Sequence, residues 1–186
     1  LNTSHATSLS SMFYGCEKLA HIDLSHFDTQ LVTSMSSMFY KCKSLQELDV
    51  SKFKTDNVKN MWRMFKGCEK LTRLDLSNFN TEKVYDMMEM FSDCVALQKI
   101  DLSHFNTSNV KSMYGMFSCC YALKMLDLSS FVTDKVTNMT YMFHTCSALT
   151  TIYVMTDNGK EHFNTDAVKQ STDMFYECNS LKGAVK

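Results

Sequence analysis

A 26-residue period runs along almost the whole chain of 186 residues and restricts its fold more than any other feature. Phenylalanines mark it most clearly, at Phe13, Phe39, Phe65, Phe91, Phe117 and Phe143. Cysteines and aspartates keep the same interval from Cys16 and Asp23 onwards. A unit this short cannot bury its apolar face alone, so successive units must stack and each coil must cover the next. The period therefore predicts a single repeat array over residues 1–186.

The last repeat departs from this spacing. The next column residues, Phe175 and Cys178, follow only after 32 residues, which places a six-residue insertion between Tyr153 and Phe163. The insertion contains Asp157-Asn158-Gly159, a composition that favours a tight turn.

The first residues align with the middle of a repeat. Leu1-Asn2-Thr3 corresponds to Phe27-Asp28-Thr29, so the chain starts in mid-repeat. We therefore expect a fragment of a longer chain, with further repeats or a capping segment upstream.

Each coil combines two local patterns. Residues 45–51 alternate apolar and polar side chains, which predicts a half-buried strand. Apolar residues of 61–68 recur mostly three or four positions apart, which predicts a short helix after an N-cap at Asn60. About nine inward positions per coil should form continuous apolar columns. The expected fold is an α/β repeat, a leucine-rich-repeat-like solenoid with a parallel sheet on one face and short helices on the other.

Composition excludes several classes of protein. With 45% hydrophobic residues, the chain is not expected to be disordered. Its formal net charge of -1 gives no electrostatic reason to expect binding to nucleic acid. No apolar stretch approaches the roughly 18 residues of a membrane helix, so we expect no membrane insertion. The sequence contains no phosphate-binding loop, zinc-protease motif or nucleophile elbow.

The repeat also resembles a known family. The stretch Leu71-x-x-Leu74-Asp75-Leu76-Ser77-x-Phe79 is similar to the strand segment of a leucine-rich repeat. The fuller pattern, continuing through Val and Met-x-x-Met-Phe-x-x-Cys-x-x-Leu, resembles the 26-residue repeat of BspA-like bacterial surface proteins. This resemblance implies a cell-surface or secreted protein linked to adhesion or host contact, and it carries over no catalytic residue.

The aspartate column is the most informative polar feature. Strand alternation turns its side chains outward, at Asp23, Asp49, Asp75, Asp101 and Asp127. Carboxylates about 4.8 Å apart repel by roughly 1 kcal/mol per neighbouring pair in water, so something must offset the repulsion. Either each carboxylate accepts hydrogen bonds from nearby amides and Ser hydroxyls, or the row binds Ca²⁺ or a repeating cationic ligand.

A second outward column varies from coil to coil. Its central members are Glu47, Arg73 and Lys99, next to the aspartates. Their charges either offset the aspartate row or present mixed charge to a protein or glycan ligand. Trp62, Tyr114 and Tyr141 lie at positions that do not face the core, and they offer a second contact surface.

The cysteine column suggests packing rather than chemistry. A Cys-x-x-Cys spacing is absent, so we expect no metal site and interpret the column as buried free thiols. Cys119 lies outside the column and is the candidate for a reactive or intermolecular thiol.

The resemblance to BspA-like proteins implies a non-enzymatic binding module without a cofactor, calcium at the aspartate row being the one open possibility. It also implies adhesion to a host or matrix protein or glycan through the repeat surface, at the cell surface or after secretion. Two alternatives remain, a passive spacer that displays another domain and a non-catalytic part of a larger enzyme.

Overall fold

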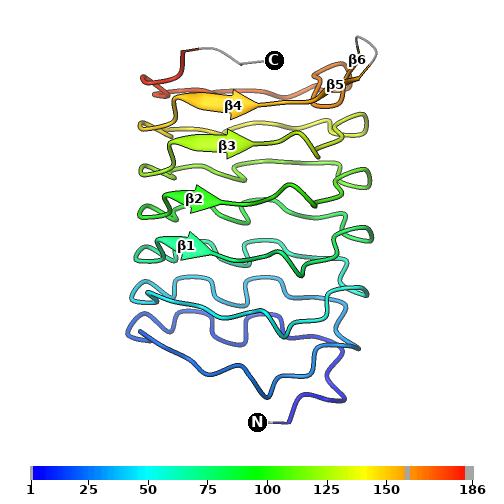
Figure 1. The fold of residues 1–186 in the computed structure, drawn as a ribbon, viewed down its shortest axis with the longest axis vertical. Coiled ribbons are helices and arrows are strands. Elements are labelled where there is room, and N and C mark those ends of the chain that lie inside the picture. Colours follow the sequence, from blue (N-terminus) through cyan, green and yellow to red (C-terminus); the bar gives the residue numbers. More distant parts are fainter. Residues whose placement is uncertain (1, 158–159, 183–186) are drawn as a thin grey trace.

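The computed structural model describes residues 2–157 and 160–182 and shows a solenoid of stacked coils (Figure 1). Four short strands follow one another along its front. Strand β1 (Arg73–Leu74) pairs in parallel with β2 (Lys99–Ile100), and β3 (Met125–Asp127) pairs in parallel with β4 (Thr151–Tyr153). The repeat array predicted from the 26-residue period is therefore present, with each coil lying directly on the next.

The predicted sheet is present but shorter than expected. Pairing covers only two or three residues per coil, and residues 45–51 form no regular strand. The alternation itself is correct, because Leu74 is buried while Arg73 and Asp75 are exposed. After the aspartate, the amide of Ser77 donates to Asp75 Oδ1 at 2.9 Å, so this amide is not available to the next coil. This local turn ends the strand.

The predicted helices are wrong. No residue of the described chain is helical, and 61–68 instead forms a ribbon of tight turns. Within it, Met64 donates its amide to the carbonyl of Met61 three residues back, at 3.2 Å. The amide of Arg63 donates across to Met88 of the following coil at 3.0 Å, as does Gly67 to Ser92 at 2.8 Å. Because alternate amides bond to the neighbouring coil, a continuous α-helical ladder cannot form. We call this side of the solenoid the turn face.

Each turn ribbon contains two residues with positive φ. In the ribbon of residues 113–120 these are Gly115 (φ 56°) and Cys119 (φ 61°). Most of the equivalent positions carry side chains, among them Glu89 (φ 53°) and the β-branched Thr145 (φ 58°). A left-handed conformation costs a non-glycine residue roughly 1–2 kcal/mol, so the stacking of coils must stabilise it.

The predicted N-cap residues have a related role. Asn60 forms a parallel bridge to Asp86 of the next coil, and its Oδ1 accepts the amide of Trp62 at 2.8 Å. The side chain therefore caps a turn rather than a helix. Burial raises the pKa of Asp86, which accepts the amide of Met88 in the same way.

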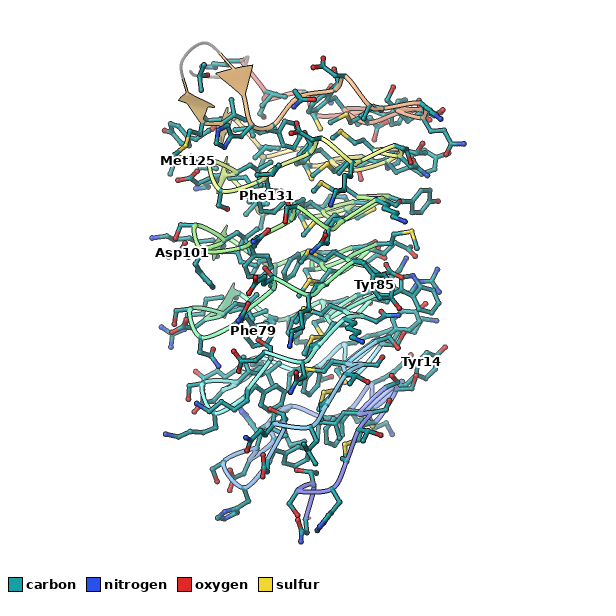
Figure 2. The ribbon with its side chains drawn as sticks, turned by 90° about the vertical axis from the view of Figure 1, so that its right-hand side faces the viewer. Tyr14, Phe79, Tyr85, Asp101, Met125 and Phe131 are labelled. Atoms are coloured by element: carbon teal, nitrogen blue, oxygen red, sulfur yellow. The ribbon has the colours of Figure 1, made fainter. Side chains whose placement is uncertain are left out.

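The core consists of nearly identical layers. One coil buries nine apolar side chains, as expected: Met61, Met64, Phe65, Cys68, Leu71, Leu74, Leu76, Phe79 and Val84. Phenylalanine rings of the column from Phe13 to Phe175 stack with centroids 5.3–5.9 Å apart. Figure 2 shows Phe79 and Phe131 inside, with Asp101 and Met125 on one side of the molecule and Tyr14 and Tyr85 on the opposite side.

Two polar columns join the coils from within. Thr81 is 1% exposed, and its hydroxyl both donates to the Asn106 carbonyl (3.1 Å) and accepts the Asn106 amide (2.8 Å). All eight cysteines are free, and Cys42, Cys68, Cys94, Cys120, Cys146 and Cys178 donate their thiols to Phe carbonyls at 2.9–3.3 Å. The column matches the expected buried thiols except at its ends, since Cys16 is exposed and Cys178 is half-buried.

The insertion in the last repeat forms a small hairpin. Strand β5 (Thr156–Asp157) pairs antiparallel with β6 (Lys160–Glu161). The tight turn predicted around Asp157-Asn158-Gly159 includes Asn158 and Gly159, which lie outside the described residues.

Candidate functional site

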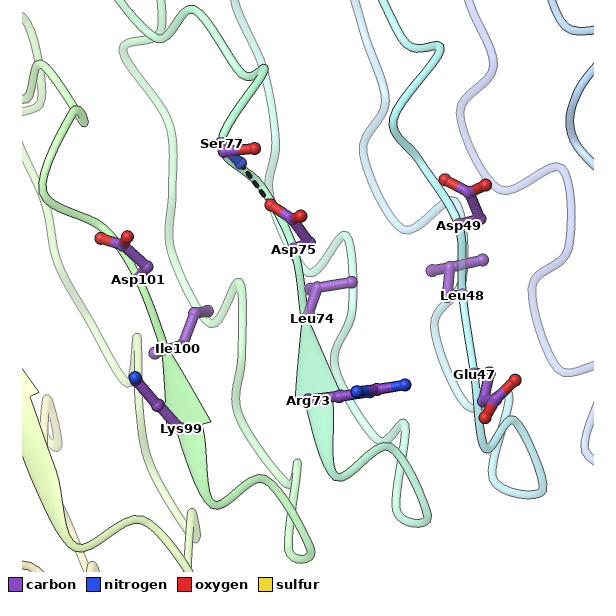
Figure 3. Close-up of a pocket in the computed structure, with 10 residues that line it drawn as sticks. All are labelled: Glu47, Leu48, Asp49, Arg73, Leu74, Asp75, Ser77, Lys99, Ile100 and Asp101. Atoms are coloured by element: carbon purple, nitrogen blue, oxygen red, sulfur yellow. Dashed lines mark hydrogen bonds between the residues drawn. The ribbon is translucent and has the colours of Figure 1, made fainter.

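The front of the solenoid carries a shallow depression of about 680 Å³ over β1, β2 and the preceding coil. We call the front the sheet face. The depression is lined by residues of three successive coils: Glu47, Leu48, Asp49, Arg73, Leu74, Asp75, Ser77, Lys99, Ile100 and Asp101 (Figure 3). It therefore brings together six of the eight predicted site residues, while Asp23 and Asp127 extend the row on either side.

The aspartate row is held by its own backbone. Asp23, Asp49, Asp75, Asp101 and Asp127 are all exposed, and each accepts the amide of the serine two residues ahead at 2.9–3.0 Å. The amide and hydroxyl of Ser77 lower the pKa of Asp75, and the equivalent serine groups lower the pKa of Asp23, Asp49 and Asp101. These bonds provide the first of the two offsets considered for the repulsion within the row.

The structure describes no preformed metal centre. Among residues 2–157 and 160–182, no three His, Cys, Asp or Glu side chains form a group that would hold a metal ion. Calcium normally requires six to eight oxygen ligands, so binding at the row would need several donors from elsewhere. Calcium binding stays a hypothesis.

The variable column presents free charge beside this row. Glu47, Arg73 and Lys99 are exposed, and the ion pairs within 4.0 Å found in the described part of the chain involve none of them. Figure 3 shows Arg73 extending towards the coil that carries Glu47. Lys99 makes only a minor contribution to lowering the pKa of Asp101, after the bonds from Ser103. The cations are thus available for contacts outside the molecule.

The sheet face changes character towards the C-terminal end. Met125, Tyr153 and Met155 are 56%, 41% and 45% exposed, and Asp127 pairs with Tyr153 across β3 and β4. Sequence reasoning did not assign this apolar part of the surface to the site. The sequence indicates this change in the last repeat, where Tyr153 occupies the position of the column aspartate.

The turn face carries the aromatic residues proposed as a second surface. Trp62, Tyr114 and Tyr141 are half-buried there, and the rings of Tyr114 and Tyr141 lie 5.7 Å apart. Sequence reasoning missed the ionic network beside them. Glu89, which is 8% exposed, pairs with Lys66 and also with Arg63 at 2.5 Å. Burial favours the neutral acid, but these two cations outweigh it and lower the pKa of Glu89.

Cys119, the predicted reactive thiol, is half-buried on the same face. The hydroxyl of Thr145 donates to its sulfur at 3.3 Å. Burial raises the pKa of the column thiols Cys42, Cys94 and Cys146 to about 12. Those thiols are unreactive at neutral pH, which leaves Cys16, Cys119 and Cys178 as the thiols that are not fully buried.

Comparison with protein families gives a match over the whole chain. The family described as "Mycoplasma protein of unknown function, DUF285" matches residues 1–100, 45–158 and 72–186. The chain belongs to the DUF285 family. No curated protein matches it.

Solved structures support a leucine-rich-repeat solenoid. A leucine-rich repeat protein of T. pallidum aligns with a TM-score of 0.50 at 18% identity, over 84% of this chain and 75% of that one. A leucine-rich cell surface protein of Faecalibacterium prausnitzii gives 0.40 at 15% identity, over 94% and 68%. A leucine-rich repeat protein of Bacteroides ovatus gives 0.37 at 18% identity, over 94% of this chain and 57% of that one. The likeness to the T. pallidum protein, at 18% identity, establishes the fold alone.

A search of the described residues for membrane-spanning helices found none of sufficient length and apolarity.

Proposed function

We propose that this chain is a non-enzymatic binding module of a bacterial surface protein, and that the sheet face holds a protein or glycan ligand. The observation that carries the proposal is a row of exposed charges that form no ion pair within 4.0 Å among residues 2–157 and 160–182. Glu47, Arg73 and Lys99 stand in register on successive coils beside the aspartates. Exposed charges that make no intramolecular pair contribute little to folding, so their regular arrangement suits recognition.

The mechanism follows from the fold. Stacked coils hold neighbouring side chains of the sheet face at the spacing of β-strands, about 4.8 Å, on a core of buried apolar side chains. A ligand that lies along the solenoid axis makes many weak contacts without paying to order the surface. Met125 and Tyr153 extend the same surface with apolar area at one end. Affinity then depends on the length of the contact rather than on one deep pocket.

Neighbours of the same fold support placing the chain at the cell surface or among secreted proteins. The F. prausnitzii protein is described as a cell surface protein. The repeat pattern adds the resemblance to BspA-like proteins, from which adhesion is the specific expectation. Neither a catalytic group nor a cofactor is required by this proposal.

The test is a binding screen of this chain against matrix proteins, mucins and glycan arrays. A triple variant, Asp75→Ala, Arg73→Ala and Lys99→Ala, is compared with the wild type, and far-UV circular dichroism verifies that it folds. A matched control carries Lys59→Ala, Lys83→Ala and Glu82→Ala, three exposed charges outside the depression.

Loss of binding in the sheet-face variant but not in the control is the expected result. Equal binding by all three proteins would move the site away from this surface. An intact chain that binds none of these ligands would favour the passive spacer. Turnover by a longer protein containing this array, and not by the array, would favour the enzyme alternative.

A further inference from the structure

The turn ribbons bond to one another in one direction only. Each ribbon except the last donates three or four amides to carbonyls of the ribbon in the following coil. In the last such contact the donors are Met139, Tyr141, Phe143 and Thr145, and the acceptors are the carbonyls of Gln170, Thr172, Met174 and Tyr176, at 2.7–3.0 Å. One end of the solenoid is therefore left with unused acceptors, and the other end with unused donors.

The last ribbon, residues 170–178, carries the unused donors. Among the hydrogen bonds of residues 2–157 and 160–182, none uses the amides that would continue the pattern, those of Ser171, Asp173, Phe175 and Glu177. All four residues are exposed, whereas Met139 and Phe143, at equivalent positions one coil earlier, are buried. The β5–β6 hairpin rises from the sheet-face side of the last coil, the side of Met125 in Figure 2, so it does not cover this edge. A row of unpaired amides is a ready site for pairing with another chain.

The first ribbon, residues 9–16, carries the unused acceptors. The carbonyls that continue the pattern there belong to Ser8, Ser10, Met12 and Tyr14, and in the described part of the chain they accept no hydrogen bond. Tyr14 and Gly15 are exposed, and a Cβ built on Gly15 would meet nothing within 4 Å. The two ends therefore present four donors and four acceptors, both at alternate residues.

The side chains of the two ends also match. Continuing the register of the coils pairs Asp173 with Ser11, Phe175 with Phe13, Tyr176 with Tyr14 and Glu177 with Gly15. The two acidic residues thus meet small neutral residues, and no like charges face each other in this list. Within the chain, Phe13 stacks on Phe39 at 5.5 Å and Phe175 stacks on Phe143 at 5.3 Å, so each has one neighbour in its column where an inner Phe has two. Tyr14 already packs edge to face on Tyr40 at 4.9 Å, which shows that this column accepts two tyrosines in succession.

Apolar surface accompanies the unpaired groups at both ends. A hollow of about 230 Å³ at the C-terminal end is lined largely by apolar side chains, among them Val154, Phe163 and Phe175. At the other end Met12 and Phe13 are only half-buried, although the equivalent residues of the next coil are completely buried. Covering this surface removes it from water, which favours association.

We propose that the two ends bind each other in different copies of this chain. The last ribbon of one copy donates its four unpaired amides to the first ribbon of the next copy, and the solenoid continues across the contact. A second copy supplies four acceptors in the required register together with a Phe and a Tyr in the required columns. The two contacting surfaces are different, so the contact does not close and copies add in a line. The contact does not depend on the function proposed for the sheet face.

Sedimentation velocity and hydrogen exchange on the unmodified chain provide the first test. With a Kd of about 50 µM, the average particle should grow from about one copy at roughly 5 µM to about four copies at roughly 500 µM. Over the same range the four unpaired amides of the last ribbon should exchange about fourfold more slowly. The amide of Phe143, which is bonded within the chain, is the internal control and should not change. A single copy at the highest concentration, or particles that leave the exchange of these amides unchanged, would overturn the proposal.

Variants then identify the two ends. Phe175→Asp blocks the C-terminal end and Phe13→Asp blocks the N-terminal end, so each variant alone should remain a single copy. An equimolar mixture should form pairs and nothing longer, because each variant retains one intact end. Tyr85→Asp replaces an exposed aromatic residue of an inner coil and should associate as the wild type does.

Circular dichroism verifies that each variant folds. Association of either end variant alone as in the wild type, or a mixture that forms no pairs, would contradict the proposal. If an end variant does not fold, the exchange of the unmodified chain decides.

Discussion

The buried threonine column gives the sharpest test of how the coils are joined. In Thr81→Val the side chain keeps its shape but loses the hydroxyl that donates to the Asn106 carbonyl and accepts the Asn106 amide. Thr81 is 1% exposed, so water cannot readily replace either bond. An unsatisfied buried donor or acceptor costs about 1–3 kcal/mol, so we expect the free energy of unfolding to fall by about 3 kcal/mol.

Urea denaturation followed by circular dichroism measures this change. With an m-value of about 3 kcal/mol/M, the midpoint should fall by about 1 M at unchanged m. Thr81→Ser is the control, because it keeps the hydroxyl and loses one methyl group, at a cost of about 1 kcal/mol. Hydrogen exchange should show the Asn106 amide protected in the wild type and in the Ser variant, and faster in the Val variant. A Val variant as stable as the Ser variant would refute the reasoning.

Three further predictions follow from other columns. Both Thr145 and Gly67 have positive φ, a conformation that costs a non-glycine residue about 1 kcal/mol. Thr145→Gly should therefore raise the free energy of unfolding by about 1 kcal/mol, and Gly67→Ala should lower it by about 1 kcal/mol. Urea midpoints that move in the opposite directions would contradict this. The hydrogen bonds from Ser77 lower the pKa of Asp75, so they stabilise the fold above pH about 4 and are lost as the pH falls through the folded-state pKa. Asp75→Asn should therefore reduce the fall in Tm between about pH 6 and pH 3. A thiol titration at pH 8 should find Cys16 and Cys119 reactive in the folded chain and Cys178 slower, because burial raises the pKa of Cys178; all eight cysteines should react after unfolding.

The inward columns could be predicted from the sequence because the stacked coils accept few other side chains at those positions. Each Phe ring of the column lies within 5.3–5.9 Å of the next, so a different side chain in one coil would disturb two neighbours. That restriction keeps Phe and Cys at a constant interval, from which the solenoid, the buried thiols and the outward aspartates were all inferred. The aspartate row and Glu47, Arg73 and Lys99 lie where the alternation put them.

The turn ribbons could not be separated from helices by apolar spacing. Met61, Met64, Phe65 and Cys68 point inward in the ribbon as they would in a helix. What differs is the pattern of backbone hydrogen bonds, and this depends on the neighbouring coil rather than on local propensity. The sequence contained one argument against a helix, because Gly67 lies inside the predicted helix and in the same column as Gly15. In the structure Gly67 has a φ of 72°. Glycine at that point favours a left-handed turn over a helix interior.

Function is then to be sought where an outward column changes, because folding does not prescribe those changes. On the sheet face, one column passes from Glu47 through Arg73 and Lys99 to the exposed Met125 within four coils. On the turn face, the column that contains Arg63 and Glu89 loses its side chain at Gly115 and so opens a hollow. On the turn face this change does not alter the path of the chain, since Glu89, Gly115 and Tyr141 all donate their amides to the following coil. Substitutions in the sheet-face column should therefore alter binding with little effect on unfolding, whereas substitutions in the Phe, Thr and Cys columns should do the opposite. A binding variant of the sheet face that also lost several kcal/mol of stability would show that this separation of columns is wrong.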